Sequence, residues 1–178
     1  MLDIGCHLRY PCKQYCSLGN LTISTTGGKD MEKRERCHII VIDDNRDLAV
    51  MVQRILKQLQ NVVITVFYLS PFGDQVLQYL KNLQEDNAKV DVLLTDIDLL
   101  GEIGFEIIHR IMLELPADCW PKFVVMSGDP EGNFGKNGSM LEYPDVMLHL
   151  AAKVEKPFLA ETIEETIRSV IATPTQKS

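Results

Sequence analysis

Four short, almost wholly apolar runs limit the possible folds of this 178-residue chain more than any other feature of its sequence. Polar residues bound each run, and the second run is rich in β-branched and aromatic side chains. Runs of this kind are typical of strands that are buried on both faces of a parallel sheet. They span residues 38–44, 62–69, 90–96 and 122–127, and a weaker fifth run spans residues 153–157.

Apolar residues at helical spacing fill the gaps between these runs. The first stripe is formed by Leu48, Val52, Ile55 and Leu59, and Asn45 stands where an N-cap is expected. Four further stripes fall within residues 76–83, 105–115, 140–152 and 163–171. Five strands that alternate with five helices predict a doubly wound α/β domain.

The composition is that of a globular chain with room for one ordinary domain and its extensions. A net charge of −7 argues against a general binder of nucleic acid or of anionic membranes. No apolar run reaches the length of about 18 residues that a membrane span needs, and the first thirty residues lack the apolar core of a signal peptide. We therefore expect a cytoplasmic protein.

The polar, glycine-containing stretch 24–36 predicts that residues 1–35 form a poorly ordered extension. The domain would then span residues 36–173, with a short tail at 174–178. The extension holds Cys6, His7, Cys12 and Cys16, which are close enough to suggest zinc. Their spacing lacks the paired CxxC pattern and no second ligand pair follows, so a loose, reduced segment is favoured.

Reactive side chains end four of the five predicted strands. Asp43 and Asp44 end the first, Asp96 ends the third, Ser127 ends the fourth and Lys156 ends the fifth. In a sheet of this kind, ligands bind beyond the carboxyl ends of the strands, so these residues should share one edge. Chains often surface at strand ends, which accounts for one or two polar residues there but poorly for four strands together.

This set of residues suits phosphoryl transfer to a carboxylate. An aspartate can act as the nucleophile and form an acyl phosphate, provided that cations and hydrogen-bond donors hold the phosphoryl group. Mg²⁺ prefers hard oxygen ligands, which Asp43, Asp44 and Asp96 can supply. Lys156 would be a point cation for a phosphoryl oxygen, and the Ser127 hydroxyl would help to complete the cradle.

Over roughly residues 36–173 the sequence resembles response-regulator receiver domains, the CheY-like domains of two-component signal transduction. The stretches IDDN, LLTDIDLLGEIG, VVMSGD and EKPF occur in the order of the family's motifs and at fitting separations. Gly104 lies eight residues after Asp96, where the family usually has a glycine. Each motif alone is weak, but the ordered set is specific. The resemblance implies a flavodoxin-like, five-stranded parallel sheet of order 2-1-3-4-5 with five helices.

The resemblance also implies how the acidic residues act. Asp96 would be the phosphoacceptor. Asp43 and Asp44 would hold Mg²⁺ together with Asp96, and the backbone carbonyl of Asp98 would be a further ligand.

For the phosphoryl group itself, the resemblance implies contacts from the Ser127 hydroxyl, from Lys156, and from the backbone N–H groups of Ile97 and Gly128. The Lys156–Pro157 peptide bond would be cis. The donor would be a phosphohistidine on a sensor histidine kinase or a histidine phosphotransfer protein. The phosphorylated domain would signal by conformational change to another protein, without direct contact to nucleic acid or membrane, and would not be a turnover enzyme.

Several positions depart from the family pattern. Leu100 replaces the usual proline, and Lys153 stands where an aromatic switch residue is common. The extra length lies in the loop 128–138, interpreted as a tolerated surface insertion or, alternatively, as a lid. The side chains of Asp98 and Asp129 would either tune the lifetime of the phosphoryl group or be solvated loop acids.

Two other functions remain as alternatives. A haloacid-dehalogenase-type phosphatase would use Asp96 as nucleophile and Asp98 as general acid, but that family normally places its Asp-x-Asp near the start of the chain. A receiver fold could also act as a phosphate-independent docking module.

Overall fold

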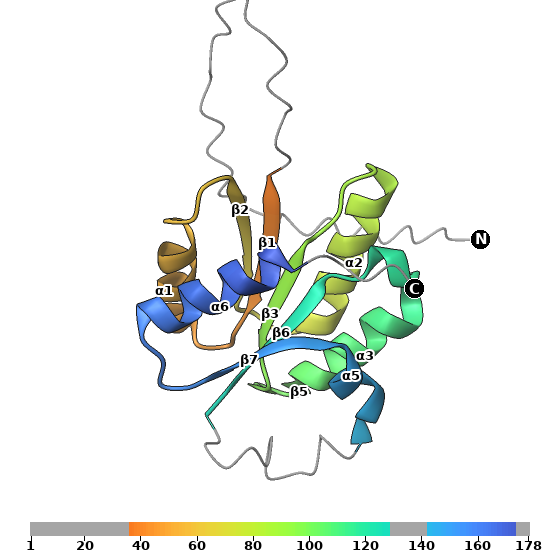
Figure 1. The fold of residues 1–178 in the computed structure, drawn as a ribbon. Coiled ribbons are helices and arrows are strands. Elements are labelled where there is room, and N and C mark those ends of the chain that lie inside the picture. Colours follow the sequence, from red (N-terminus) through yellow and green to blue (C-terminus); the bar gives the residue numbers. More distant parts are fainter. Residues whose placement is uncertain (1–35, 129–141, 174–178) are drawn as a thin grey trace, which may run out of the picture. The chain divides into compact units, whose positions relative to one another are not determined.

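The computed structural model describes residues 36–128 and 142–173. The expected extension 1–35, the tail 174–178 and Asp129, with nearly all of the loop 128–138, lie outside the described residues, so the predictions for them stay predictions. A five-stranded sheet, parallel throughout, runs through the domain in the order β2-β1-β3-β6-β7 (Figure 1). Its strands are β1 (Cys37–Ile42), β2 (Val62–Phe67), β3 (Val92–Asp96), β6 (Lys122–Ser127) and β7 (Leu150–Glu155).

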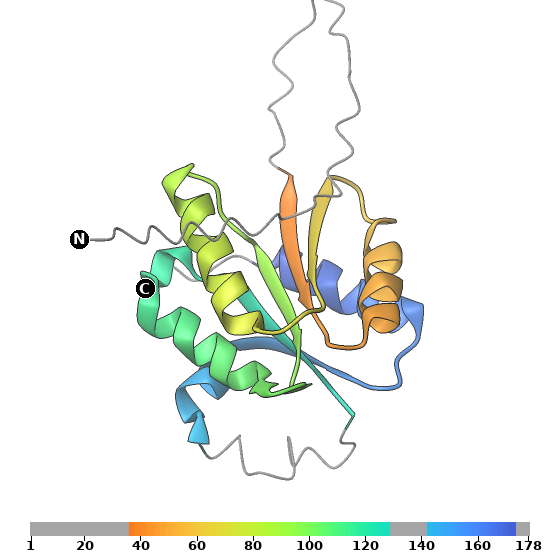
Figure 2. The same ribbon diagram turned by 180° about the vertical axis from the view of Figure 1, so that it is seen from behind.

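Five α-helices in the described ranges cover the two faces of this sheet. They are α1 (Arg46–Leu56), α2 (Phe72–Glu85), α3 (Gly104–Glu114), α5 (Pro144–His149) and α6 (Ala160–Ala172). Helices α1 and α6 lie on one face, and α2, α3 and α5 lie on the other (Figures 1 and 2). A small antiparallel hairpin, β4 (Asp98–Leu99) with β5 (Glu102–Ile103), follows β3, and a 3₁₀ turn, η1 (Ala117–Cys119), precedes β6. The predicted flavodoxin-like fold and strand order are confirmed.

Alternation along the central strands builds two cores, one on each face of the sheet. In β1, Ile40 and Ile42 pack toward α2 and α3, while Ile39 and Val41 pack toward α1 and α6. Strands β1, β3 and β6 are almost fully buried, as their apolar runs predict. Strand β2 is only partly buried because it lies at the sheet edge, and Val63 is 39% exposed.

The boundaries of several elements differ from the sequence predictions. The helix expected at 140–152 is shorter among the described residues, at Pro144–His149, because residues 150–152 pair with β6 and belong to β7. The first strand ends at Ile42 instead of residue 44, since the chain turns there into the N-cap of α1. Asn45 fills that cap as predicted: its side chain accepts hydrogen bonds from the N–H groups of Asp47 and Leu48.

No α-helix within the described ranges combines the length and the apolar character needed to cross a membrane.

Candidate functional site

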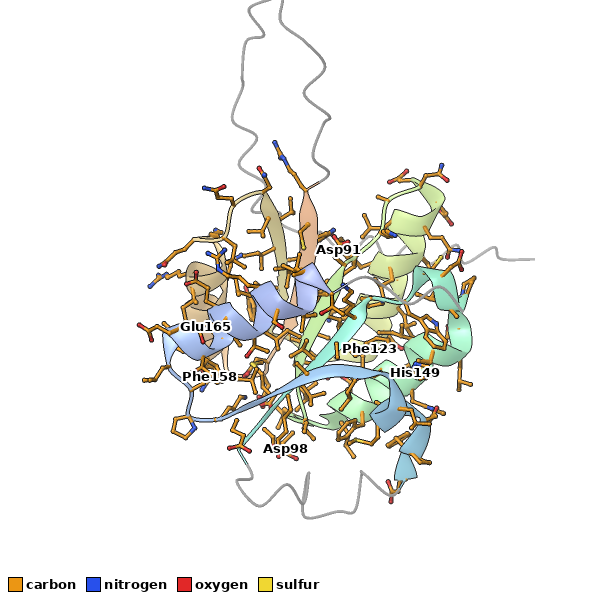
Figure 3. The ribbon with its side chains drawn as sticks, in the orientation of Figure 1. Asp91, Asp98, Phe123, His149, Phe158 and Glu165 are labelled. Carbon is orange, nitrogen blue, oxygen red and sulfur yellow. The ribbon has the colours of Figure 1, made fainter. Side chains whose placement is uncertain are left out.

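The predicted site residues meet at the carboxyl edge of the sheet. Asp96 is the last residue of β3 and Ser127 is the last residue of β6. Asp43 follows β1 directly, and Lys156 follows β7 directly. These four strands are neighbours in the sheet, so one edge carries all four side chains. Figure 3 shows Asp98 at this edge, at the lower end of the sheet, and Asp91 at the opposite end.

Lys156 connects the two buried acids. Its Nζ lies 2.8 Å from Oδ2 of Asp43 and 2.7 Å from Oδ2 of Asp96. Asp43 is fully buried and Asp96 is 8% exposed, while the Lys156 side chain is 18% exposed. Removing such charges from water is costly unless they are paired and hydrogen-bonded, as they are here. Together with the exposed Asp44, the group still carries more acids than cations, which leaves it attractive to a further cation.

Burial and charge shift the pKa values of this pair upward. Burial raises the pKa of Asp96, the ammonium group of Lys156 opposes this rise, and the neighbouring Asp43 adds to it. For Lys156, burial lowers the pKa, but hydrogen bonds to Asp43 and Asp96 and the charges of these acids outweigh burial and raise it. Lys156 therefore stays charged at neutral pH, and its charge favours the ionised form of Asp96.

The three carboxylates are arranged so that one metal ion could bind to them. One oxygen from each of Asp43, Asp44 and Asp96 lies within 4.8 Å of the others. Ligands on opposite sides of an octahedral Mg²⁺ ion lie about 4.2 Å apart, so small side-chain movements would bring these oxygens onto one ion. Asp44 is exposed, which leaves room for water ligands on its side. The residues present therefore fit Mg²⁺.

The backbone after Asp96 is shaped by a close approach of Gly104. The N–H of Gly104 donates to the carbonyl of Ile97 at 2.9 Å. A Cβ atom at Gly104 would lie 2.1 Å from the backbone oxygen of Asp96, so a side chain cannot be accommodated without movement of the backbone. Between these residues, the hairpin turns at Leu100 and Gly101, and Gly101 has a φ of +82°, which favours glycine. The turn therefore forms without the family's proline.

Asp98 lies on the first strand of this hairpin. Its backbone N–H opposes the rise in the pKa of the Asp96 carboxyl group, and its side chain is exposed. The N–H of Ile97, predicted to bind the phosphoryl group, donates to the carbonyl of Met126 at 3.1 Å. A phosphoryl oxygen would have to share that donor or replace its partner.

The remaining predicted residues lie on β6 and β7 or directly after these strands. Ser127 is buried, and its carbonyl accepts the N–H of Lys156 at 2.6 Å; Gly128 is exposed. The Lys156–Pro157 bond is cis, as the resemblance implies. Lys153 lies on β7, paired in register with Val125.

Sequence reasoning missed one residue of this region, Glu102. It lies on β5, but its carboxylate accepts hydrogen bonds from the N-terminus of α2. The partners are 29 and 30 residues away along the chain, so no local pattern could have indicated the contact. The zinc candidates Cys6, His7, Cys12 and Cys16 fall outside the described part of the chain.

Among the solved structures that match this fold are several receiver domains. One, the signal receiver domain of an HD domain-containing protein from Pseudomonas fluorescens Pf-5, matches with a TM-score of 0.57 and 16% identity, covering 85% of this chain and 93% of that one. A CheY-like response regulator receiver domain protein from Methanospirillum hungatei JF-1 matches with a TM-score of 0.57 and 16% identity, covering 77% and 94%. A response regulator from Thermotoga maritima matches with a TM-score of 0.56 and 18% identity, covering 78% and 99%.

No protein-family model matches the sequence, and no curated protein matches it either. The structural likeness is therefore a likeness of fold: this chain has the fold of the response-regulator receiver domains, at low sequence identity to them.

Proposed function

We propose that this chain is a Mg²⁺-dependent receiver that accepts a phosphoryl group on Asp96. The observation that carries the proposal is the bridge from Lys156 to Asp43 and Asp96, with Asp44 beside them, at the carboxyl edge of a receiver-type sheet. The donor would be a phosphohistidine on a sensor histidine kinase or a histidine phosphotransfer protein. A receiver fold, in general terms, fits such a partner.

In the proposed reaction, an oxygen of ionised Asp96 attacks the phosphorus atom. The new P–O bond forms as the P–N bond to the donor histidine breaks, and the imidazole leaves with its electron pair and takes up a proton. Asp43, Asp44, Asp96 and the Asp98 carbonyl would hold Mg²⁺, which when bound neutralises negative charge on the phosphoryl group. Lys156 lowers the pKa of Asp96 against the effect of burial and so favours its ionised form before the attack.

After the transfer, the negative charge of Asp96 has moved outward onto the phosphoryl oxygens. Lys156 would then bind a phosphoryl oxygen, and the hydroxyl of Ser127, which is buried at the end of β6, would donate to another. Such rearrangements would bias the domain between two conformations. The surface of β6, α5 and α6 is the proposed region of readout, and the phosphoryl group would later be lost to water, without turnover of any other substrate.

The test is the intact mass of the protein after incubation with acetyl phosphate, with Mg²⁺ and with a chelator. We expect one added phosphoryl group that requires Mg²⁺ and is absent from the Asp96→Asn variant, since that variant lacks the nucleophile. The Glu165→Gln variant, which changes an exposed acid on α6, is the matched control and should keep the adduct (Figure 3).

The same experiment separates the alternatives. If wild-type protein gains no mass and releases no inorganic phosphate, the proposal fails and a phosphate-independent docking module is favoured. If phosphate is released without an adduct, both a receiver that rapidly loses its phosphoryl group and a phosphatase that uses Asp98 as general acid fit the result, and hydrolysis of a phosphate monoester by wild-type protein would favour the phosphatase.

A further inference from the structure

Glu102 links the hairpin that follows Asp96 to a helix elsewhere in the sequence. Its Oε2 accepts the backbone N–H of Phe72 at 2.5 Å, and its Oε1 accepts the N–H of Gly73 at 2.9 Å. The hydroxyl of Ser70 lies 3.4 Å from Oε2. One carboxylate thus binds two backbone donors in the first turn of α2.

These donors have no other cap among the described residues. The N-cap position of α2 is Pro71, which makes no side-chain hydrogen bond to the helix. The first N–H groups of a helix need partners from outside the helix, and a carboxylate there also interacts favourably with the helix dipole. Gly73 is buried, and a Cβ atom on it would lie 3.0 Å from Oε1 of Glu102. The absence of a side chain at Gly73 therefore lets the carboxylate approach.

The hairpin held in this way also carries the backbone next to the acidic site. Glu102 on β5 pairs with Leu99, and Ile103 pairs with Asp98. Asp98 is two residues from Asp96 in the chain, and its backbone N–H opposes the rise in the pKa of the Asp96 carboxyl group. On the other side of the hairpin, Gly104 is fixed by its hydrogen bond to Ile97. Glu102 and Asp98 thus belong to the same two-stranded ladder, so a shift of Glu102 would also shift the backbone of Asp98.

We propose that Glu102 is a positioning residue for the metal site. It clamps the hairpin to the N-terminus of α2, and this holds the Asp98 backbone in the place from which its carbonyl would bind Mg²⁺. The metal part of the inference rests on the proposed function. Glu102 touches neither the phosphoryl group nor the ion, and it acts through the geometry of the hairpin. Residues that orient metal ligands in this way strongly affect metal affinity.

The test compares Glu102→Ala and the near-isosteric Glu102→Gln with wild-type protein. Glu114→Gln is the matched control, because Glu114 also joins α3 to α2, through Lys81 at 2.6 Å, but has no contact with the hairpin. Amide hydrogen exchange is measured over residues 97–104 and the first turn of α2. Mg²⁺ affinity is measured by titration calorimetry, without any phosphodonor.

In Glu102→Ala we expect amide exchange in the hairpin and the first turn of α2 to be about tenfold faster. We expect Mg²⁺ to bind about tenfold more weakly in the same variant. Glu102→Gln, which keeps one acceptor oxygen, should fall between Glu102→Ala and wild type. Glu114→Gln should match wild type in both measurements.

Unchanged exchange and unchanged Mg²⁺ affinity in Glu102→Ala would overturn the inference. Faster exchange with unchanged affinity would also overturn it, since the clamp would then be structural only. Wild-type protein that binds no Mg²⁺ at all would instead overturn the proposed function and the metal part with it, while the exchange data would still decide whether Glu102 holds the hairpin.

Discussion

Gly104 and the backbone of Asp96 approach each other so closely that the residue type at position 104 is constrained by the site. The atom that would clash is the carbonyl oxygen of Asp96, which would lie 2.1 Å from a Cβ atom at position 104. The obstacle is backbone and not a flexible side chain, so a side chain at position 104 would require movement of the chain next to the proposed nucleophile.

We therefore expect Gly104→Ala to lower the free energy of unfolding by about 2 kcal/mol, the scale of overpacking in a tight core. The same change should slow phosphorylation of Asp96, because the hairpin must shift. Gly128→Ala is the control, since a Cβ there meets no atom of the described residues within 4 Å, and it should change stability by less than about 0.5 kcal/mol. Urea unfolding of both variants gives the comparison, and equal stabilities would contradict the steric argument.

At the residue scale, the sequence identified those side chains whose position follows from a strand end. Asp43, Asp96 and Lys156 were predicted to meet because each stands at the carboxyl end of its strand, and the structure brings them together. Glu102 could not be found in this way. Its contact depends on where the N-terminus of α2 lies in space, which only the tertiary structure defines.

At the scale of elements, α5 is the shortest of the described α-helices. It has six residues, of which Val146 alone is fully buried. Polar and aromatic contacts supply much of the rest: His109 Nδ1 of α3 lies 2.8 Å from Oδ2 of Asp145, and the rings of Trp120 and His149 lie 5.2 Å apart. Figure 3 shows His149 at the α5 end of the sheet. A helix with so few buried side chains can shift at a low cost in free energy.

Removal of the α3–α5 hydrogen bond should loosen α5 selectively. In His109→Ala we expect amide exchange over residues 144–149 to be about fivefold faster, the effect of losing about 1 kcal/mol from a partly exposed pair. Trp120 fluorescence should also change, because His149 moves with α5. Arg110→Gln is the control, as Arg110 lies on the same helix but pairs with Asp74 of α2. Equal exchange over 144–149 in the two variants would contradict this assignment.

The elements also show where local sequence is a poor guide. Residues 150–152 read Leu-Ala-Ala, which favours a helix by intrinsic propensity. In the structure they form the start of β7, because Leu150 and Ala152 pair with Phe123 and Val124. The long apolar runs needed no such correction, since a run buried on both faces is specified by its own composition.

At the scale of the whole molecule, the burial of the Asp96 carboxyl group lowers the stability of the folded protein at neutral pH. Its pKa is raised in the folded protein, chiefly by burial. Such a carboxyl group stabilises the folded state when it is protonated. Its contribution to the free energy of unfolding is fully present below its pKa in the unfolded chain, about 3.9, and is lost as the pH rises through its pKa in the folded protein.

In the presence of chelator, Asp96→Asn should therefore be more stable than wild type at pH 7, and the difference should shrink as the pH falls toward 3.9. Lys156 keeps its bond to Asp43 in this variant and stays protonated over the whole range. Urea unfolding across this pH range measures the effect, with Glu165→Gln as the exposed control. A constant difference between wild type and Asp96→Asn at all pH values would show that Asp96 does not cause the dependence.

The bridge from Lys156 to Asp43 joins residues that are 113 positions apart. During synthesis the ribosome releases Asp43 and Asp96 long before it releases Lys156, and domains fold only as their parts emerge. Until β7 joins the sheet, two carboxylates destined for burial lack their cation. A chain that lacks β7 and Lys156 thus cannot form this bridge, so the proposed phosphoacceptor site is complete only after the whole domain has been synthesised.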